Sequence, residues 1–157
     1  MPLNTDKSPT VTDALNTRIT CRDFLDTPVP EDVLMRILNM AMRSPSGGNL
    51  QPWKLHVMTG ETLAEFKKRA AERTLAGKLE EPTYRAYPSP LWEPQRSWRY
   101  KLGEDMYGLV GIPRENKMGR MVWLAQNAKF FDAPVGIIIT GNKKLEMPQY
   151  MDIGILT

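Results

Sequence analysis

The clearest hydrophobic pattern along the chain is a one-sided apolar stripe between residues 31 and 43. Its apolar positions recur every three to four residues, which is the period of an α-helix with one face towards a core. They are Val33, Leu34, Ile37, Leu38 and Ala41. Pro28 and Pro30 interrupt the chain before this stripe, and Glu31 and Asp32 favour the positive end of a helix dipole. We therefore predict a helix over 31–43.

Two segments have the pattern of β-strands. Between Trp53 and Thr59 apolar and polar residues alternate, which predicts a strand with one buried face. The run from Pro134 to Thr140 is mostly apolar and rich in β-branched residues, which predicts a strand buried on both faces. Helices are predicted around these strands over about 62–76, 101–109 and 113–131, with short ones from Thr10, which forms a capping box with Asp13, and from Pro148. The mixture indicates an α+β or α/β fold.

The segment from Glu80 to Tyr100 differs in composition from the rest of the chain. Prolines interrupt it repeatedly, which argues against a regular helix or a central strand. Aromatic residues and arginines lie between them, and the main members are Pro82, Tyr84, Arg85, Tyr87, Pro88, Pro90, Trp92, Pro94, Arg96, Trp98, Arg99 and Tyr100. We expect the region 80–112 to form a lid or wall over an aromatic ligand, or a dimer contact. The alternative is an irregular segment whose aromatic side chains simply pack on the core.

Composition narrows the class of protein. A chain of 157 residues fits a single domain, 1–157, with 41% hydrophobic and 25% charged residues, as in globular proteins. The net charge is only +3, with basic and acidic residues interspersed, so we expect no nucleic-acid partner. One cysteine excludes an internal disulfide framework, and no apolar run reaches the length of a membrane span. The first 25 residues lack a signal-peptide pattern, so we expect a cytoplasmic protein.

The residues that usually carry catalysis are scarce. One cysteine and one histidine, Cys21 and His56, cannot form a metal site at any known ligand spacing. His56 lies within a predicted strand and no nucleophile-elbow motif accompanies it, so hydrolysis by a serine triad is not expected. Cys21 has arginines nearby that would favour a thiolate, although a cysteine is more often a small packing residue. Enzymes without acid–base side chains often let a cofactor carry the reaction.

Two polar patches suit ligand binding. The first, Ser44 to Trp53, joins the helix to the strand and contains small hydroxyls, adjacent glycines and two amides. It can cradle a flat polar ligand, or it can be a plain helix-to-strand connection. The second patch comprises Arg18, Thr20 and Arg22, whose guanidinium forks and hydroxyl suit a phosphate or a ring with carbonyl oxygens. Alternatively, the two arginines are solvated charges at a helix end.

The order and spacing of these motifs resemble the FMN-dependent nitroreductase family. The shared motifs are Arg18-x-Thr20-x-Arg22-x-Phe24, Pro28-Val29-Pro30-Glu31, Pro45-Ser46-Gly47-Gly48-Asn49-Leu50-Gln51-Pro52-Trp53, Phe131-Asp132-Ala133-Pro134 and Tyr150-Met151-Asp152-Ile153-Gly154. The resemblance extends from about Val11 to Ile155. The aromatic segment further resembles a subgroup that acts on nitrobenzoate-like and dinitroaniline-like compounds.

The resemblance implies a three-layer α/β/α sandwich with FMN at a homodimer interface. It implies reduction of nitroaromatic or quinone-like acceptors by NAD(P)H in a ping-pong cycle, with the flavin carrying the chemistry and no catalytic side chain or metal. By the same resemblance, Arg18, Thr20 and Arg22 hold FMN, and Asn127 contacts its ring. Four further residues reach the flavin of the opposite subunit: Pro45, Ser46, Gly47 and Asn49.

Family members continue beyond the equivalent of Thr157, so the resemblance implies that the C-terminal part of the fold is missing here. The alternative to an active enzyme is therefore a non-catalytic fragment or a protein-binding module with little affinity for flavin. A flavin enzyme with another type of acceptor is a third reading. Arg85, Arg96 and Arg99 are candidates for steering a carboxylated substrate.

Overall fold

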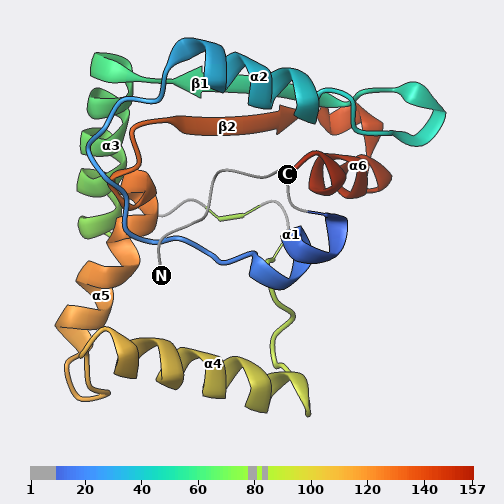
Figure 1. Ribbon diagram of the computed structural model, residues 1–157. Helices are drawn as coiled ribbons and strands as arrows, with labels where there is room; N and C mark the ends of the chain where they lie inside the picture. The colour runs from blue at the N-terminus through green and yellow to red at the C-terminus, as the bar shows by residue number, and fades with distance from the viewer. Residues whose placement is uncertain (1–9, 78–80, 83–84) are drawn as a thin grey trace.

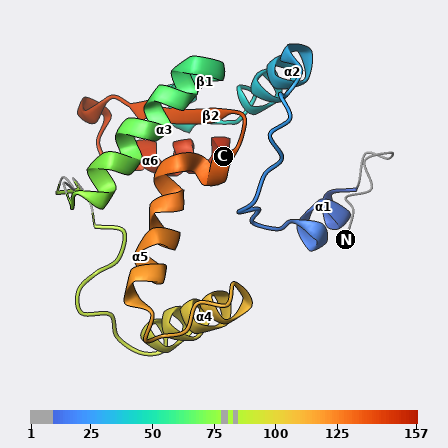
Figure 2. The ribbon, with the colours of Figure 1, turned by 90° about the vertical axis from the view of Figure 1, so that its left-hand side faces the viewer.

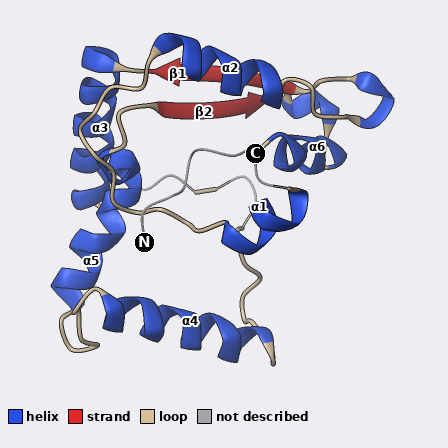
Figure 3. Cartoon of the chain, in the orientation of Figure 1, coloured by secondary structure: helices blue, strands red, loops and turns tan. Residues whose placement is uncertain are grey.

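The computed structural model describes residues 10–77, 81–82 and 85–157, so Glu80 and Tyr84 of the predicted aromatic segment lie outside the described residues (Figure 1). Helices surround a small sheet formed by two strands, β1 and β2 (Figure 3). In chain order the elements are α1 (Val11–Thr17), α2 (Glu31–Ala41), η1 (Gly47–Asn49), β1 (Trp53–Met58), α3 (Gly60–Leu75), α4 (Gln95–Leu109), α5 (Lys117–Ala125), η2 (Gln126–Asp132), β2 (Gly136–Gly141), η3 (Lys143–Leu145) and α6 (Pro148–Leu156).

The two predicted strands pair with each other. They run antiparallel, with Trp53 opposite Gly141 and Met58 opposite Gly136. His56 Nε2 and Thr140 Oγ1 lie 3.0 Å apart in a hydrogen bond between the strands. The expectation that β2 is buried on both faces is wrong for this chain, because only Gly136 at its start is buried and its isoleucines are half-buried. The reason is that β2 has one neighbouring strand among the described residues and its remaining surroundings are open.

The packed core lies where α3 meets η2 and the start of β2. Leu63 and Ala71 of α3 are buried, and the rings of Phe66 and Phe130 pack with centroids 5.7 Å apart. The Lys67 ammonium donates a hydrogen bond of 2.7 Å to the carbonyl oxygen of Ala133. This contact anchors α3 to the segment that leads into β2, so the position of η2 is set from one side by α3.

Helix α2 is amphipathic as predicted but packs loosely. It lies on one side of the sheet and α3 on the other (Figure 2), and none of its residues is fully buried. A hollow of about 730 Å³ separates α2 from β1 and α3, with Leu38, Val57 and Leu63 among its lining residues. Val57, predicted to face inwards, is consequently 37% exposed.

The chain exposes far more surface than a closed monomer of its size. Its accessible surface is 13209 Å² for a mass of 17.9 kDa, whereas a compact monomer of that mass exposes about 8,000 Å². Large apolar side chains on several helices contribute to the excess, among them Leu15, Ile37, Leu109 and Met151. Much apolar surface is therefore available for contacts outside the described chain.

Two helices, α4 and α5, have clearly different bounds from those predicted from the sequence. Helix α4 begins at Gln95 and not near Lys101, because Pro94 occupies the N-cap position, where a missing N–H costs nothing. Trp98 and Tyr100 are thus helical, and the expected irregular segment ends earlier. Helix α5 begins at Lys117, where the Asn116 side chain accepts a hydrogen bond of 2.8 Å from the Gly119 N–H. It ends at Ala125, and the 3-10 segment η2 replaces the remainder of the predicted helix.

Candidate functional site

A hollow of about 900 Å³ lies between α4, α5 and the loop before α4. Aromatic side chains form much of its wall: Tyr87, Tyr100, Tyr107, Trp123 and Phe131. Arginines hold two of these rings in place, since the Arg120 guanidinium lies 4.1 Å from the ring centroid of Tyr107 and Arg114 donates a hydrogen bond to the Tyr100 hydroxyl. The wall is therefore aromatic, polar at its edges and suited to a flat ligand.

Two of the predicted site residues meet in this hollow. Arg22 comes from the extended segment after α1, and Asn127 comes from η2, yet both line the same space. The Arg22 guanidinium lies 6.0 Å from the ring centroid of Phe131. The Asn127 amide donates a hydrogen bond of 2.9 Å to the Leu124 carbonyl at the end of α5, which fixes its position. Arg22 and Asn127 therefore line one space although they are distant along the chain.

The backbone beside these residues is strained. Phe130, Phe131 and Asp132 are consecutive residues with φ of 54°, 51° and 61°, and the left-handed region costs about 1–2 kcal/mol for each such residue. Strain of this kind concentrates at ligand sites, where the surrounding structure maintains it. Here it turns the Phe131 ring edge-on against Trp123, with centroids 6.2 Å apart, and into the hollow.

Arg18 and Thr20 lie outside the hollow. Arg18 follows α1 directly and its guanidinium contacts the Thr20 hydroxyl at 3.4 Å. Both are exposed, as is the whole of α1. The predicted capping box at the start of α1 is confirmed, because the Thr10 hydroxyl accepts from the Asp13 N–H at 3.1 Å and the Asp13 carboxylate accepts from the Thr10 N–H at 3.1 Å.

The first predicted patch, Ser44 to Trp53, lies away from this hollow. The segment 45–49 adjoins α6 (Figure 1), where the Gly47 N–H contacts the Asp152 carboxylate at 3.2 and 3.3 Å. Ser46 Oγ accepts a hydrogen bond of 2.9 Å from the Gln51 N–H, and Asn49 Oδ1 accepts one of 3.1 Å from the Gln51 side chain. Hydrogen bonds within the loop and to Asp152 therefore hold this segment in place. It does not line the hollow beside Arg22, and this applies to all four predicted residues, Pro45, Ser46, Gly47 and Asn49.

Positive φ angles give this loop its shape. Gly48 has φ of +59°, and Asn49 follows it with φ of 55°. Glycine adopts such angles freely, and asparagine tolerates them better than most residues. The expectation that the paired glycines permit positive φ is confirmed at Gly48.

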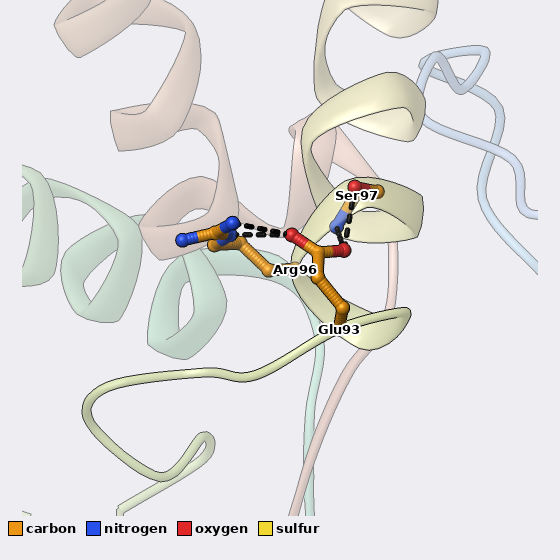
Figure 4. Close-up of polar contacts among 3 residues, drawn as sticks. All are labelled: Glu93, Arg96 and Ser97. Atoms are coloured by element: carbon orange, nitrogen blue, oxygen red, sulfur yellow. Dashed lines mark hydrogen bonds and ion pairs between the residues drawn. The ribbon is translucent and has the colours of Figure 1, made fainter.

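Helix α4 is anchored at its start by Glu93 (Figure 4). One carboxylate oxygen accepts from the Arg96 guanidinium at 2.6 Å. The other accepts from the Ser97 hydroxyl at 2.6 Å and from the Ser97 N–H at 3.2 Å. These hydrogen bonds, from the Ser97 hydroxyl first and Arg96 second, hold the pKa of Glu93 below its usual value. They satisfy a free N–H in the first turn of the helix that carries much of the hollow's wall.

We expect the start of α4 to loosen in acid. A carboxyl whose pKa is lowered by folding stabilises the fold above its unfolded pKa, near 4.5, and that contribution is lost as the pH falls through the lower folded pKa. The protection factors of the amides at 95–98, which correct for the intrinsic exchange rate at each pH, should therefore fall below about pH 4.5. Ser97→Ala removes the main cause and should raise the Glu93 pKa in an NMR titration. An unchanged pKa in that variant would contradict the assignment.

The two other side chains considered for catalysis, His56 and Cys21, do not line the hollow. His56 is engaged with Thr140 within the sheet, and the thiol of exposed Cys21 donates to the Asp23 carbonyl at 3.0 Å. Over 10–77, 81–82 and 85–157, no three His, Cys, Asp or Glu side chains gather closely enough to hold a metal ion. None of the described helices is long and apolar enough to cross a membrane.

The structure also reveals site residues that sequence reasoning did not select. Tyr107, Trp123 and Phe131 line the hollow, but Tyr107 and Trp123 lie in segments that read as ordinary helix. Their recruitment depends on how α4 and α5 meet, which no local pattern encodes. The adjacent Phe130 and Phe131 are the available signal in the sequence, because two consecutive large aromatics directly before Asp132 and Pro134 rarely share one environment.

Comparison with known proteins identifies the family to which the chain belongs. A family model described as the nitroreductase family matches residues 15–156. The chain is 37% identical over 153 residues to chloronitrobenzene nitroreductase of Comamonas testosteroni and 36% identical over 152 residues to nitrobenzene nitroreductase of Ectopseudomonas oleovorans. In both cases the match covers 94% of this chain and 65% of the relative. The chain thus spans slightly less than two thirds of the length of these relatives.

A solved structure agrees with the fold. The FMN and NADPH-dependent nitroreductase NfnB from Sphigopyxis sp. strain HMH superposes with a TM-score of 0.85 at 37% identity, over 94% of this chain and 67% of that one. The predicted α+β, nitroreductase-like fold is confirmed by this match. Sequence and structure agree over nearly the whole described chain, and the protein belongs to the nitroreductase family.

Proposed function

We propose that the protein is an FMN-dependent oxidoreductase that reduces nitroaromatic or quinone-like acceptors with NAD(P)H. The observation that carries this proposal is the shared hollow, where Arg22 and Asn127 lie beside several aromatic rings. Its volume of about 900 Å³ is within the range of small-molecule and cofactor sites. The similarity to enzymes named for chloronitrobenzene and nitrobenzene reduction, and to an FMN and NADPH-dependent structure, supports the same assignment.

The donors of Arg22 and Asn127 in the hollow, together with those of Arg18 and Thr20 outside it, fit FMN. The Arg22 guanidinium and the Asn127 amide offer hydrogen bonds to ring carbonyls, and Arg18 with Thr20 offers a fork and a hydroxyl to a phosphate. Arg22 also supplies positive charge, which favours a reduced ring that carries negative charge. Bound FMN would supply the electron transfer that no side chain here can perform. The residues of the chain would bind and orient it, and the aromatic walls would exclude water.

The loop 45–49 would complete the site of a second subunit. It lies on the α6 side and not at the hollow beside Arg22, so we propose that Pro45, Ser46, Gly47 and Asn49 contact FMN held mainly by a partner in a homodimer. The accessible surface of 13209 Å² supports a partner, because it exceeds that of a compact monomer by several thousand Å². The region 80–112 would then serve as the wall or lid of the acceptor site.

The aromatic hollow beside Arg22 and Asn127 supports the proposed ping-pong scheme. It would receive the nicotinamide ring of NAD(P)H and the acceptor in turn, because both need access to the same exposed face of the cofactor ring. Alternating occupancy of one site corresponds to a ping-pong cycle. The acceptor would leave as the reduced product, and protons would come from solvent, since the hollow is open and no acid–base side chain is proposed.

The direct test is to purify the protein, add FMN, remove the excess and record the visible spectrum. We expect one flavin per chain, and NAD(P)H-dependent reduction of nitrobenzene with parallel double-reciprocal plots. A protein that retains no flavin and reduces neither nitroaromatics nor quinones would contradict the proposal. That result would favour the alternative of a non-catalytic fragment or a protein-binding module.

A further inference from the structure

The charges around the aromatic hollow are unevenly balanced. Three arginines and one glutamate line it: Arg22, Arg96, Arg99 and Glu104. Glu104 is already paired, because its carboxylate accepts from the Arg120 guanidinium at 2.8 and 3.2 Å. That hydrogen bonding lowers the pKa of Glu104, which keeps it ionised and paired. Glu104 therefore does not neutralise the other arginines of the wall.

Arg96 is also paired with a carboxylate. Its guanidinium approaches the Glu93 carboxylate at 2.6 Å through two nitrogens, and the same carboxylate caps α4 through Ser97 (Figure 4). A ligand carboxylate would have to displace this arrangement. Arg85, a third candidate from the sequence, does not line the hollow. The only cations of the wall without a carboxylate contact among the described residues are Arg22, near Phe131, and Arg99.

Arg99 has the geometry of an anion receptor. Its guanidinium lies 4.6 Å from the ring centroid of Tyr87, and this cation–π contact holds it beside the ring. The Tyr87 ring is itself 56% exposed, so a second planar group can approach the same wall. A guanidinium held by a ring keeps its in-plane N–H groups, which bind a carboxylate in a bidentate fashion.

We propose that Arg99, supported by Tyr87, is the residue that selects acceptors carrying a carboxylate on the aromatic ring. The inference rests on the proposed function, since it assigns the acceptor class of the same hollow. Arg22 would face the cofactor, and Arg99 would hold the anionic group of the acceptor. An uncharged nitroarene would enter the same walls without that contact.

The experiment compares Arg99→Gln with Arg96→Gln as a matched control on the same helix. The readout is the ratio of kcat/KM for 4-nitrobenzoate to kcat/KM for nitrobenzene in the FMN-loaded protein. We expect Arg99→Gln to lower this ratio about 10- to 100-fold, the usual effect of losing a charged hydrogen-bond pair. Arg96→Gln should change it by less than about 3-fold, because its charge is already compensated. Arg99→Lys should restore part of the ratio.

Three outcomes would overturn the inference. The first is an unchanged ratio in Arg99→Gln, and the second is an equal fall in Arg96→Gln. A changed preference between NADPH and NADH in Arg99→Gln, with the acceptor ratio unaltered, would assign the residue to the donor phosphate and would also overturn it.

Ligand binding separates this inference from the proposed function. Trp123 lines the hollow, so nitroarenes should quench tryptophan fluorescence and report their dissociation constants without turnover. Weaker binding of 4-nitrobenzoate, but not of nitrobenzene, in Arg99→Gln would support Arg99 even if no variant reduced either compound. Turnover of both compounds without any dependence on Arg99 would support the proposed function and reject the inference.

Discussion

Arg22→Ala is expected to weaken FMN binding about 10- to 100-fold, because it removes charged hydrogen bonds that are each worth about 1.5–3 kcal/mol. Arg22 is the predicted motif residue that reaches the aromatic hollow, where it lies against Phe131. Titration of the flavin-free protein with FMN, followed by flavin fluorescence, measures the dissociation constant. Arg22→Lys keeps the charge but loses the fork, so its affinity should fall between those of the other two proteins.

Arg36→Ala is the matched control for this experiment. Arg36 is an exposed arginine on α2 and lines none of the hollows beside Arg22. Its removal changes the net charge equally but should leave the FMN affinity within about 2-fold, since exposed charges are well screened. If Arg36→Ala and Arg22→Ala weakened binding to the same degree, the effect would be general electrostatics and the assignment of Arg22 would be wrong.

Leu63→Ala should destabilise the fold by about 2–5 kcal/mol, the range for removing a fully buried leucine. Leu63 is 3% exposed and is the most buried of the core residues on α3. Urea denaturation followed by circular dichroism measures the free energy of unfolding. Leu109→Ala is the control, because Leu109 is 89% exposed on α4 and its loss should cost less than about 0.5 kcal/mol. Equal effects of the two substitutions would contradict the position of the core.

A double substitution tests the contact itself. A Cβ added at Gly136 would lie 2.7 Å from Leu63 Cδ1 and 3.2 Å from Phe130 Cε2. Gly136→Ala alone should therefore cost about 1–3 kcal/mol through overpacking. In the Leu63→Ala background the new methyl group enters vacated space, so its cost should shrink or change sign. Strictly additive free energies would show that the two positions do not touch.

Local signals in the sequence determined much of the secondary structure. The Thr10 and Asp13 capping box, the stripe that begins after Pro30, the alternation from Trp53 and the proline at position 148 each mark an element that is present. These signals act over one or two helical turns, which is why they can be read without tertiary information. The predicted start of α4 is wrong for a related reason. In the sequence Pro94 has the pattern of one more interruption, whereas its position at the N-cap makes it compatible with a helix.

The candidate site, too, has some features that the sequence indicated and others that it did not. Its residue types and their order along the chain, from Arg18 to Asn127, were sufficient to suggest a flat anionic or carbonyl-bearing ligand and the family. The sequence did not indicate that Arg22 and Asn127 share a hollow while the loop 45–49 lies near α6. It also did not indicate that Arg96 forms an ion pair with Glu93, whereas Arg99 contacts the Tyr87 ring and no carboxylate among the described residues.

By itself, the sequence determined which segments form helices and strands and which residues have the chemistry to bind a flavin. Only the tertiary structure decided that β1 pairs with β2, that Phe131 turns into the hollow on a strained backbone, and which arginines of the hollow keep an uncompensated charge. The physical reason is the distance along the chain over which each kind of interaction acts. Helix caps and hydrophobic periods depend on neighbours a few residues away, whereas strand pairing, cavity walls and charge compensation join segments that are distant along the chain.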